Sequence, residues 1–572
     1  MRAGMEIRNL DDTKRNGKVY TPRPLADFLA ERTLTSLLQS DSISILDPAC
    51  GDGELLIASE TVCREAGFNG QIKLTGCDTD PTALKKAQER LSNSSSTLEL
   101  IEGSFLEIHK ALPPNSFDAV ITNPPYVRTQ HLGSAKARQL ATEFNLKGRV
   151  DLTHAFVAAC QSPLRNGGRL GLICSNRILS TQAGQNVRRV FLNGPLALSE
   201  IYDLGDTKLF RASVLPAVLI AEKINNTESL PKVRSNAKYV SVYERKDIAT
   251  DPRPLFQTLS GSSPGDAAFN GRTYEVKMGE LKLPHDPKEP WRLSTNDSDE
   301  WLERVKRGTW KSFGQICKIR VGVKTTADQV FIRSDWGKIE PEIEEELLHP
   351  LITNRMIDPW RISTVVPDRI LYPYDMDQAK RRIVDIETFP ATFSYLMENE
   401  ERLRSRKYLT ESGREWWEIW VPQSPLLWSF PKVVFPDISE RPRFAIDRSG
   451  AIVNGNCYWI SSLDLPHNDL MYLILAVANS EMGLRFYDET CGNRLYSGKR
   501  RWITQYVSKM PLPAPWLEQS RRVIQIAKGL SEQQTVVPDE QAELNDAVNR
   551  AFIASALQLT QPRDLDGPLR LF

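Results

Sequence analysis

The sequence places Asn123, Pro124, Pro125 and Tyr126 directly after the apolar stretch 117–122. Two consecutive prolines can neither donate to a β-ladder nor continue a helix, so these residues predict a rigid turn at the end of a strand. The Asn123 side-chain oxygen and a backbone carbonyl fixed by the prolines can both accept N–H bonds from a planar exocyclic amine. Such bonds localise the lone pair of the amine on nitrogen, and Tyr126 provides a ring face for stacking. The motif therefore indicates a clamp that prepares a conjugated amine for attack on an electrophile.

A second group of residues predicts a loop that approaches a ligand closely. In ILDPACGDGELL, a strand ends at Asp47, the following turn contains Ala49, Gly51 and Gly53, and a helix comes next. Glycines at the first strand-to-helix turn let the backbone come near a bound molecule. The third glycine of a pyrophosphate loop and the lysine of a triphosphate loop are both missing, so neither phosphate group is indicated.

Two further residues extend this site to the next two strands. Asp78 ends the stretch 71–78, where a carboxylate can accept hydrogen bonds from ribose hydroxyls, and Phe105 follows the next strand and can pack on an adenine ring. An adenosine ligand without phosphates, held partly by acidic groups, suits the cationic cofactor S-adenosyl-L-methionine. The alternatives are that Asp78 caps the helix over 81–91 and that Phe105 is a core residue. Three pieces on three successive strand ends favour the cofactor site.

These residues need a scaffold that brings strand ends together. From residue 42 to about residue 223, short apolar or β-branched runs alternate with amphipathic helical stretches. The strand candidates are 43–49, 71–78, 98–103, 117–123, 169–176, 198–205 and 214–222, and the helix candidates are 54–66, 81–91 and 151–164. This alternation predicts an α/β fold with a mostly parallel, Rossmann-like sheet and helices on both faces. The ligand then belongs at the carboxyl ends of the strands.

The second half of the chain has a different texture. After about residue 225, prolines and tryptophans become frequent and the strand-helix rhythm stops. We therefore expect a catalytic domain over 1–225, a linker or extension over 226–300, a mixed α/β domain over 301–515 and a helical C-terminal segment over 516–572.

Composition limits the class of protein. The chain has 572 residues, a net charge of +1, 41% hydrophobic residues and 25% charged residues. These values are typical of a globular protein, and the sequence contains neither an apolar run of membrane-spanning length nor an apolar signal peptide, so we expect a cytoplasmic protein without a membrane partner. The eight cysteines form no C-x-x-C pair and have no histidine at metal-ligand spacing, so we expect no metal site. Cys50, Cys77, Cys160 and Cys174 are predicted to be small buried hydrophobes.

Two stretches carry local positive charge. Residues 401–414 include Arg402, Arg404 and Lys407, and residues 494–509 include Lys499, Arg500 and Arg501 with the aromatic residues Tyr496, Trp502 and Tyr506. Such stretches suit a nucleic acid backbone, although either one alone is equally consistent with a solvated face.

Taken together, these motifs resemble the DNA amino-methyltransferases, specifically the N6-adenine enzymes of restriction-modification systems in the TaqI-like, Eco57I-type methylase family. Tyr20, Thr21 and Pro22 match the N-terminal motif that contacts the methionine part of the cofactor in that family. DPACGDG matches its cofactor glycine loop, Asp78 its ribose-binding acid, and Asn-Pro-Pro-Tyr its catalytic motif in full.

The resemblance implies roles for further residues. Phe210 matches the position that stacks on the extruded base, and Phe156 lies, more loosely, where the family often contacts the cofactor adenine. One position departs from the family pattern, because Ser104 stands where an Asp usually binds the adenine amino group. Weaker matches, among them LLHPLITNRMIDPW and FPKVVFPDIS, resemble the C-terminal specificity domain of the family.

The resemblance implies a site-specific DNA methyltransferase that flips an adenine out of double-stranded DNA and methylates N6, with a separately encoded restriction endonuclease as its cognate partner. We expect no fused nuclease, since about twenty residues precede the Tyr20 motif in the sequence. Rival interpretations are an RNA-guanine or protein-glutamine methyltransferase with the same amine clamp, a non-catalytic DNA-binding subunit, and the modification subunit of a larger restriction complex. Cytosine N4 also fits the clamp, although Asn123 favours adenine because N4 enzymes more often carry Ser there.

Overall fold

The structure is a computed structural model, and it falls into two compact units. The first comprises residues 1–296 and 490–498, and the second comprises residues 297–489 and 499–572. The residues described are 20–126, 134–147, 151–205, 207–210, 215–225, 237–245, 251–281, 283–284, 286–363, 368–491, 495, 498–533 and 535–559.

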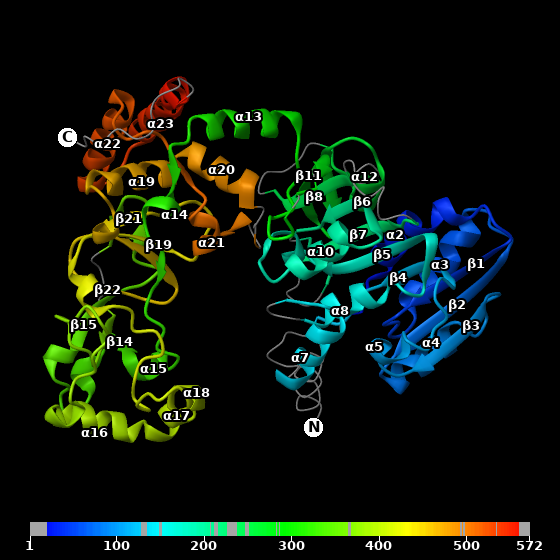
Figure 1. The fold of residues 1–572 in the computed structure, drawn as a ribbon, viewed down its shortest axis with the longest axis horizontal. Coiled ribbons are helices and arrows are strands. Elements are labelled where there is room, and N and C mark those ends of the chain that lie inside the picture. Colours follow the sequence, from blue (N-terminus) through cyan, green and yellow to red (C-terminus); the bar gives the residue numbers. More distant parts are fainter. Residues whose placement is uncertain are drawn as a thin grey trace. The chain divides into compact units, whose positions relative to one another are not determined.

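The first unit is built on an eleven-stranded sheet with the strand order β3-β2-β1-β4-β5-β7-β6-β8-β11-β10-β9 (Figure 1). The strands are β1 (Ser42–Asp47), β2 (Gln71–Asp78), β3 (Thr97–Glu102), β4 (Phe117–Thr122), β5 (Leu164–Ser175), β6 (Leu196–Asp203), β7 (Pro216–Lys223), β8 (Ala237–Glu244), β9 (Arg253–Pro254), β10 (Gly265–Phe269) and β11 (Arg272–Leu281). Strands β1 to β5 are mutually parallel where they pair, as predicted from the strand-helix alternation. The carboxyl ends of β1, β2, β3 and β4 therefore meet at one edge.

Helices cover both faces of this sheet. They are α2 (Arg23–Leu34), α3 (Glu54–Glu65), α4 (Pro81–Arg90), α5 (Phe105–Ile108), α7 (Ser134–Glu143), α8 (Leu152–Ala159), α9 (Arg177–Ser180), α10 (Gln185–Asn193) and α12 (Leu255–Ser260), with a short 3₁₀ turn, η1 (Thr35–Leu37), after α2. Buried side chains of α2, α3, α4 and α12 pack with Ile45 and Ile121 on one face. Buried side chains of α5, α8 and α10 pack with Leu46 and Val120 on the other. Successive side chains of each strand point to opposite faces of the sheet and so contribute to two separate apolar layers. This arrangement confirms the α/β class.

The far half of the sheet is mixed rather than parallel. Strand β7 runs antiparallel to both β5 and β6, β8 pairs parallel to β6, and β11 pairs antiparallel to β8 and β10. Within the stretch expected as a linker or extension over 226–300, the described strands β8, β9, β10 and β11 extend the sheet of the first unit. The absence of strand-helix rhythm there has a simple reason, since antiparallel neighbours need no crossover helix.

The second unit contains two small sheets and several helices. One sheet has the order β13 (Arg320–Val321), β23 (Cys457–Ser461), β19 (Lys432–Pro436), β21 (Ala445–Asp447), and the other has the order β14 (Ile332–Arg333), β18 (Arg369–Leu371), β15 (Leu348–Ile352), β22 (Ile452–Val453). Short ribbons pair β20 (Ile438–Ser439) with β24 (Arg500–Arg501), β16 (Ile357–Asp358) with β17 (Arg361–Ile362), and β12 (Lys311–Ser312) with β25 (Pro511–Leu512). The longer helices include α13 (Asn296–Arg307), α16 (Pro390–Glu398), α19 (Asp469–Asn479), α20 (Glu481–Cys491), α22 (Glu518–Glu532) and α23 (Pro538–Leu559).

Tryptophans fill much of the core of this unit. Trp336, Trp416, Trp417, Trp428 and Trp459 all belong to one buried apolar cluster. Their frequency in the sequence therefore reflects packing, because large aromatic side chains compensate for short strands. Within the described ranges, no helix is both long enough and apolar enough to cross a membrane.

Candidate active site

The N-terminal motif enters the site through the start of α2. Pro22 takes an extended conformation and its carbonyl accepts the N–H groups of Leu25 and Ala26, so the helix begins directly after Tyr20-Thr21-Pro22. The Tyr20 side chain is 54% exposed, and its ring lies beside Gly51, where an added Cβ would meet Tyr20 Cε1 at 3.6 Å. The predicted Tyr-Thr-Pro turn and the predicted glycine loop are therefore neighbours.

Two glycines shape the loop between β1 and α3. Gly51 and Gly53 have φ angles of 52° and 85°, in the left-handed region that residues with a Cβ rarely adopt. A Cβ at Gly53 would also lie 3.1 Å from Ala87 Cβ of α4. The two positions thus require glycine for backbone reasons, and the loop can present N–H groups toward a ligand without an intervening side chain.

Asp78, at the end of β2, organises this loop. Its Oδ2 accepts the Gly51 N–H at 2.9 Å and its Oδ1 accepts the Asp80 N–H at 2.9 Å. The Cys50 N–H also bonds to the carbonyl of Cys77, so the ends of β1 and β2 are joined by backbone and side chain. The alternative role of capping the next helix belongs to Asp80, which accepts the Thr82 N–H, and not to Asp78.

Asp47, at the end of β1, is a buried carboxyl with an unused acceptor. It is 1% exposed, its Oδ1 accepts the Ala49 N–H at 3.1 Å, and its Oδ2 is buried without a hydrogen-bond partner. Burial raises the pKa of the Asp47 carboxyl to about 7, and the nearby Asp78 carboxylate acts in the same direction. A cationic ligand would satisfy the unused oxygen and favour the ionised form, so this donor set fits S-adenosyl-L-methionine.

A pH-dependent effect follows from this carboxyl. Its pKa of about 7 in the fold lies above the ordinary value of 3.8, so the folded protein keeps a proton that the unfolded chain loses, and this contribution to stability falls as the pH rises toward 7. The variant Asp47→Asn cannot ionise at this position, so its stability does not fall with pH for this reason. We expect its stability advantage over the wild type, measured by urea unfolding without cofactor, to grow by on the order of 2 kcal/mol between about pH 5.5 and about pH 8.

Calorimetry with the cofactor completes this test. Because the ionised carboxylate is the form that attracts a cation, Asp47→Asn should bind S-adenosyl-L-methionine more weakly at about pH 8. Parallel stability curves for the two proteins across this pH range would contradict the assignment of a raised pKa to Asp47.

Asn123 lies where the Asn-Pro-Pro-Tyr turn meets the N-terminal motif. It follows β4 directly, is 9% exposed, and donates from Nδ2 to Thr21 Oγ1 at 3.1 Å. The Tyr126 hydroxyl donates to Asn123 Oδ1 at 2.8 Å, and burial raises the pKa of Tyr126 well above its ordinary value, which keeps that hydroxyl protonated. The oxygen expected to accept the amine proton is thus occupied by the tyrosine of the same motif in the free protein.

The second proline of the turn is contacted from a neighbouring helix. Thr153 Oγ1 donates to the Pro125 carbonyl at 3.5 Å, and Thr153 stands in the first turn of α8. That helix begins with a capping box between Asp151 and His154. The sequence motifs gave no indication of this Thr153–Pro125 contact, and only the place of Thr153 in the first turn of the predicted helix could have suggested it.

Phe105 and Phe156 form one aromatic pair. Phe105 opens α5 and is 1% exposed, Phe156 belongs to α8 and is 6% exposed, and their ring centroids lie 5.6 Å apart. Both predicted adenine contacts are therefore brought together, and they are packed against each other in the free protein. Ser104 is the N-cap position of α5 without a side-chain capping bond.

Phe210 lies in the apolar layer that also contains α2. It is 5% exposed and clusters with Leu204 and Leu209. Stacking on a base requires Phe210 to leave this layer or the layer to open. Residues 206 and 211–214, which flank it, lie outside the described residues.

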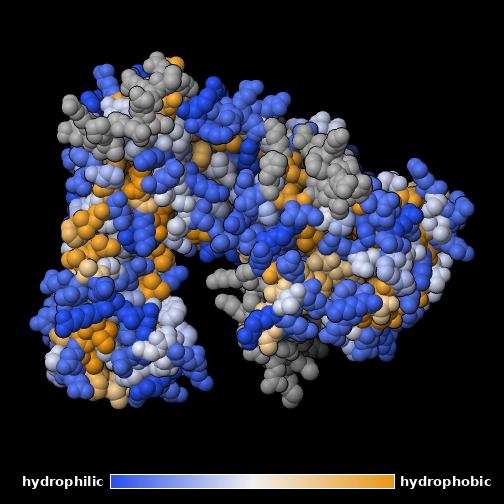
Figure 2. All heavy atoms as spheres, viewed as in Figure 1, coloured by the Kyte–Doolittle hydropathy of each residue, from blue (hydrophilic) through white to orange (hydrophobic). Residues whose placement is uncertain are grey.

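The predicted DNA-binding residues differ in their exposure and in their contacts with other side chains. Arg402 and Lys407 are exposed, on α17 (Glu400–Arg404) and α18 (Lys407–Glu411). Arg404 bonds to Glu400 at 2.7 Å and lies over the Trp416 ring. Over these helices Figure 2 shows mainly hydrophilic side chains, with an apolar area at α16, where Phe393 and Met397 are 37% and 42% exposed.

Most residues of the second basic stretch make structural contacts within the protein. Lys499 is exposed, but Arg500 holds Asp488 through two bonds of 2.6 and 2.7 Å, and Arg501 pairs with Ile438 in the β20–β24 ribbon. Trp502 and Tyr506 are 0% and 2% exposed, so these aromatics pack in the core. Arg494 and Tyr496 lie outside the described residues.

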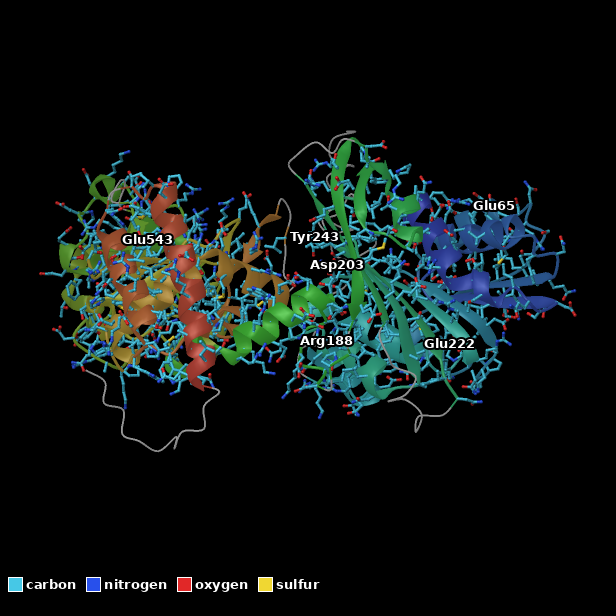
Figure 3. All side chains as sticks on the ribbon, turned by 90° about the horizontal axis from the view of Figure 1, so that it is seen from above. Glu65, Arg188, Asp203, Glu222, Tyr243 and Glu543 are labelled. Carbon is cyan, nitrogen blue, oxygen red and sulfur yellow. The ribbon has the colours of Figure 1, made fainter. Side chains whose placement is uncertain are left out.

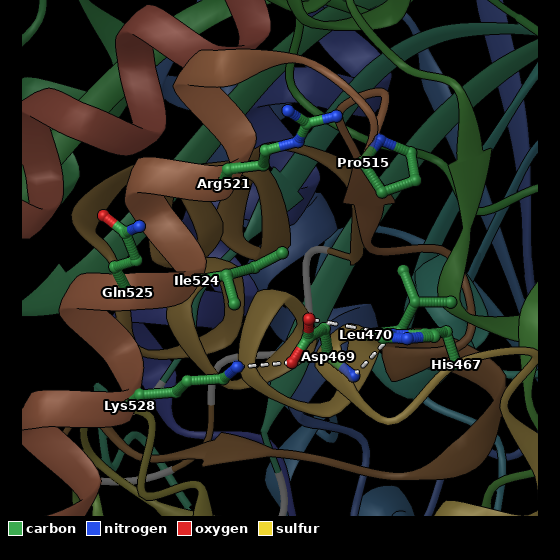
Figure 4. A pocket seen from close by; sticks show the side chains of 8 residues that line it. All are labelled: His467, Asp469, Leu470, Pro515, Arg521, Ile524, Gln525 and Lys528. Atoms are coloured by element: carbon green, nitrogen blue, oxygen red, sulfur yellow. Dashed lines mark hydrogen bonds and ion pairs between the residues drawn. The ribbon is translucent and has the colours of Figure 1, made fainter. Parts of the chain in front are cut away.

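A cavity in the second unit is separate from all of these residues. It measures about 250 Å³ and lies between the start of α19 and one face of α22 (Figure 4). Asp469 pairs there with Lys528 at 2.5 Å and lies 3.7 Å from His467. None of the predicted site residues lines it. Among the described residues, no group of three or more His, Cys, Asp or Glu could hold a metal ion.

Comparisons with known proteins agree with this geometry. Residues 7–263 match the family N-6 DNA Methylase. The Type II methyltransferase M.BanIII of Aneurinibacillus aneurinilyticus is 36% identical, over 90% of this chain and 93% of that protein. The Type II methyltransferase M.BstVI of Geobacillus stearothermophilus is 24% identical, over 87% and 90%. The solved structure of the type IIL restriction-modification enzyme MmeI in complex with DNA covers 95% of this chain and 74% of that chain, with a TM-score of 0.60 at 14% identity, and shows the same fold.

The sheet and its ligand edge define an S-adenosyl-L-methionine-dependent methyltransferase fold. Within that class, the chain belongs to the DNA N6 methyltransferase family of restriction-modification systems, as a relative of the type II methyltransferases. The resemblance expected from the motifs is confirmed.

Proposed function

We propose that this protein transfers a methyl group from S-adenosyl-L-methionine to N6 of an adenine flipped out of double-stranded DNA, and that it marks specific sites against a separately encoded endonuclease. The observation that carries the proposal is the position of the Asn123 amide. It stands at the end of β4, bonded to Thr21 of the turn that also contacts the glycine loop. An amine acceptor held by Asn123 would therefore lie beside the predicted cofactor site.

The chain's own groups would act on the amine in two ways. Asn123 Oδ1 would accept one N–H of the amine, in place of the Tyr126 hydroxyl that it accepts in the free protein. A carbonyl of the proline turn would accept the other N–H, and these bonds localise the nitrogen lone pair. The released Tyr126 ring can then stack on the base.

The chemistry itself needs no strong base. When bound, the cofactor supplies a sulfonium methyl group as electrophile. The amine nitrogen would form a bond to this methyl carbon, the carbon–sulfur bond would break with its electron pair leaving on the neutral thioether, and the methylated amine would lose one proton to solvent. Asn123 and the proline turn would orient the nitrogen for this attack, since positioning supplies a large share of such rate gains.

The extrusion of the base has an energetic requirement. Unstacking and unpairing one adenine costs a few kcal/mol, which contacts to the flipped ring must offset. Tyr126 and Phe210 are the two aromatics proposed to make them. Phe210 is packed in the core of the free protein, so this role includes its rearrangement when DNA binds.

The second unit is proposed to read the DNA sequence. Its exposed Arg402 and Lys407 suit phosphate contacts, whereas Arg500 is held by Asp488 and suits a structural role. Side chains of the same unit would read base edges.

We expect Arg402→Ala combined with Lys407→Ala to weaken DNA binding and to reduce its dependence on salt. Each lost phosphate contact lowers the slope of log affinity against log salt by about 0.9, so the pair should lower it by up to about 2. Fluorescence anisotropy of a labelled duplex between low and moderate salt measures this slope. Lys528→Ala is the matched control, because Lys528 is paired with Asp469 on another face of the same unit. A double variant with the slope of the control would remove α17 and α18 from the interface.

The test of the function itself is methylation-sensitive long-read sequencing of DNA from cells that express this chain alone, against Asn123→Ala. One sequence motif that carries N6-methyladenine only with the wild type is the expected result. N4-methylcytosine in that motif would reassign the acceptor. Unmodified DNA from a folded, cofactor-binding protein would overturn the proposal in favour of an RNA or protein acceptor.

A further inference from the structure

The segment that follows β6 is tied to the sheet by a buried carboxylate. Asp203, the last residue of β6, is 3% exposed. Its Oδ1 accepts the Gly205 N–H at 3.1 Å and Asn176 Nδ2 at 3.0 Å, and its Oδ2 accepts the Tyr243 hydroxyl at 2.7 Å. Figure 3 labels Asp203 and Tyr243 as neighbouring side chains in the first unit. The Gly205 N–H, the Asn176 amide and the Tyr243 hydroxyl thus all donate to one buried carboxylate.

A second tyrosine holds the same segment two residues further on. The Tyr274 hydroxyl donates to the Thr207 carbonyl at 3.2 Å, and Tyr274 is fully buried. Tyr243 belongs to β8 and Tyr274 to β11. Both anchors therefore come from the strands that extend the sheet beyond β7.

The backbone of the segment also lies directly on β8. Gly205 has a φ angle of 49°, and a Cβ there would lie 2.1 Å from the Val242 carbonyl oxygen. On the other side, the Asn176 N–H bonds to the Leu215 carbonyl at 2.8 Å, so Asn176 touches both the start of the segment and the residue before β7. The chain just after β6 is thus held at Gly205 and Thr207, and Asn176 connects Asp203 with Leu215.

We propose that Asp203, Tyr243 and Tyr274 are positioning residues for the target base. They hold Gly205 and Thr207 just after the carboxyl end of β6, and Phe210, the residue proposed to stack on the flipped adenine, follows Thr207 by three residues. The inference rests on the proposed function. It gives strands β8 and β11 a functional role, because their tyrosines determine the position of the backbone that carries Phe210 toward the base.

The physical basis is the cost of order at the moment of binding. Phe210 must leave the core when DNA binds, and anchors at Gly205 and Thr207 keep the neighbouring backbone ordered, so less conformational entropy is lost when the ring stacks on the base. Removal of one hydroxyl leaves a buried carboxylate oxygen with one donor fewer, which weakens the anchor without removing the ring.

The test compares Tyr243→Phe with Tyr202→Phe. Tyr202 is a matched control because its hydroxyl also donates to a carboxylate on the same sheet, Glu200 at 2.6 Å, but holds no part of residues 204–210. With the methylated motif known from sequencing, a duplex carrying 2-aminopurine at the target adenine reports base flipping by fluorescence. Single-turnover methylation reports the rate, and calorimetry reports cofactor affinity.

We expect Tyr243→Phe to lower both the 2-aminopurine signal and the single-turnover rate by about tenfold, the effect of losing one hydrogen bond to a buried charge. Tyr202→Phe should leave both readouts within about twofold of the wild type. Melting temperature and cofactor affinity should be alike in the two variants.

A double-mutant cycle covers the case in which Tyr243→Phe folds poorly. Asp203→Asn keeps an oxygen for Gly205 and Asn176 and replaces the oxygen that accepts the Tyr243 hydroxyl, so it should lower the flipping signal similarly, and the double variant should lose no more than either single one. Suppose that the wild type methylates DNA and that Tyr243→Phe and Asp203→Asn both give the same flipping signal as Tyr202→Phe. This result would overturn the positioning role and leave the proposed function intact. A wild type that does not methylate DNA would overturn the proposed function, and this inference with it.

Discussion

Asn123→Ala is expected to reduce methyl transfer by about 10³-fold or more, while affinity for the cofactor stays within about threefold of the wild type. The loss is large because alanine removes the only side-chain oxygen proposed to accept an N–H of the target amine. The Thr21 hydroxyl also loses the donor that reaches it from Nδ2. Single-turnover assays with tritiated cofactor measure the rate, and calorimetry measures the affinity.

Tyr126→Phe separates two explanations of such a loss. Its hydroxyl occupies Asn123 Oδ1 in the free protein, whereas its ring is proposed to stack on the base. Phenylalanine keeps the ring and frees the oxygen, so its rate should stay within about tenfold of the wild type, whereas Tyr126→Ala should approach Asn123→Ala. Asn115→Ala is the control for a generic asparagine effect, since Asn115 bonds to Lys223 at the surface. Appreciable turnover in Asn123→Ala would contradict the amine clamp.

The edge of the sheet that carries the candidate site could be predicted from local sequence. Asp47, Gly51 and Gly53 mark a strand, a left-handed turn and a helix start, and the structure has all three. The Pro124-Pro125 pair marks the end of β4 for a similar reason, because proline excludes both a further ladder bond and a helix. Side chains at successive parallel strand ends must share one edge, so their proximity follows from topology alone.

The buried cysteines were equally predictable. Cys50, Cys77, Cys160 and Cys174 are free and buried, as expected for small apolar side chains. Burial raises the pKa of the Cys77 thiol to about 12, so it is unreactive at neutral pH.

Long-range partners could not be predicted in the same way. The sequence presents Arg500 as one of a run of basic residues, but its guanidinium is taken by Asp488 on α20. Arg406, within the other basic stretch, is 5% exposed and bonds to the carbonyls of Thr325 and Trp416. A count of charges does not distinguish a cation that faces solvent from one that holds carbonyls of distant loops.

The strands at the far end of the sheet could not be predicted from the sequence because of the way they pair. Strand β8 pairs with β6 and β11, and none of these contacts leaves a strand-helix period in the sequence. Tyr243 and Tyr274 could therefore be placed near Asp203 and Thr207 only by the fold itself.

The second large effect is expected at Asp78. Asp78→Ala should lower cofactor affinity by about 100-fold or more, because the variant loses the proposed ribose contact and also the acceptor of the Gly51 and Asp80 N–H groups. Two lost hydrogen bonds to a charged acceptor correspond to about 3 kcal/mol or more, which is a factor of about 100. Calorimetric titration with S-adenosyl-L-methionine measures the affinity directly.

Asp78→Asn distinguishes loop organisation from ribose recognition. The amide keeps one carbonyl oxygen, so it can retain one backbone N–H but cannot accept on both sides, and its affinity should lie between those of the wild type and Asp78→Ala. Glu99→Ala controls for the lost charge, since Glu99 stands on the adjacent β3 and pairs at the surface with Lys73. If Asp78→Asn bound the cofactor as weakly as Asp78→Ala, the negative charge itself would be the dominant contribution. If Asp78→Ala bound the cofactor as tightly as Glu99→Ala, neither the proposed ribose contact nor the bond from Asp78 to the Gly51 N–H would contribute to binding, and Asp78 would not belong to the cofactor site.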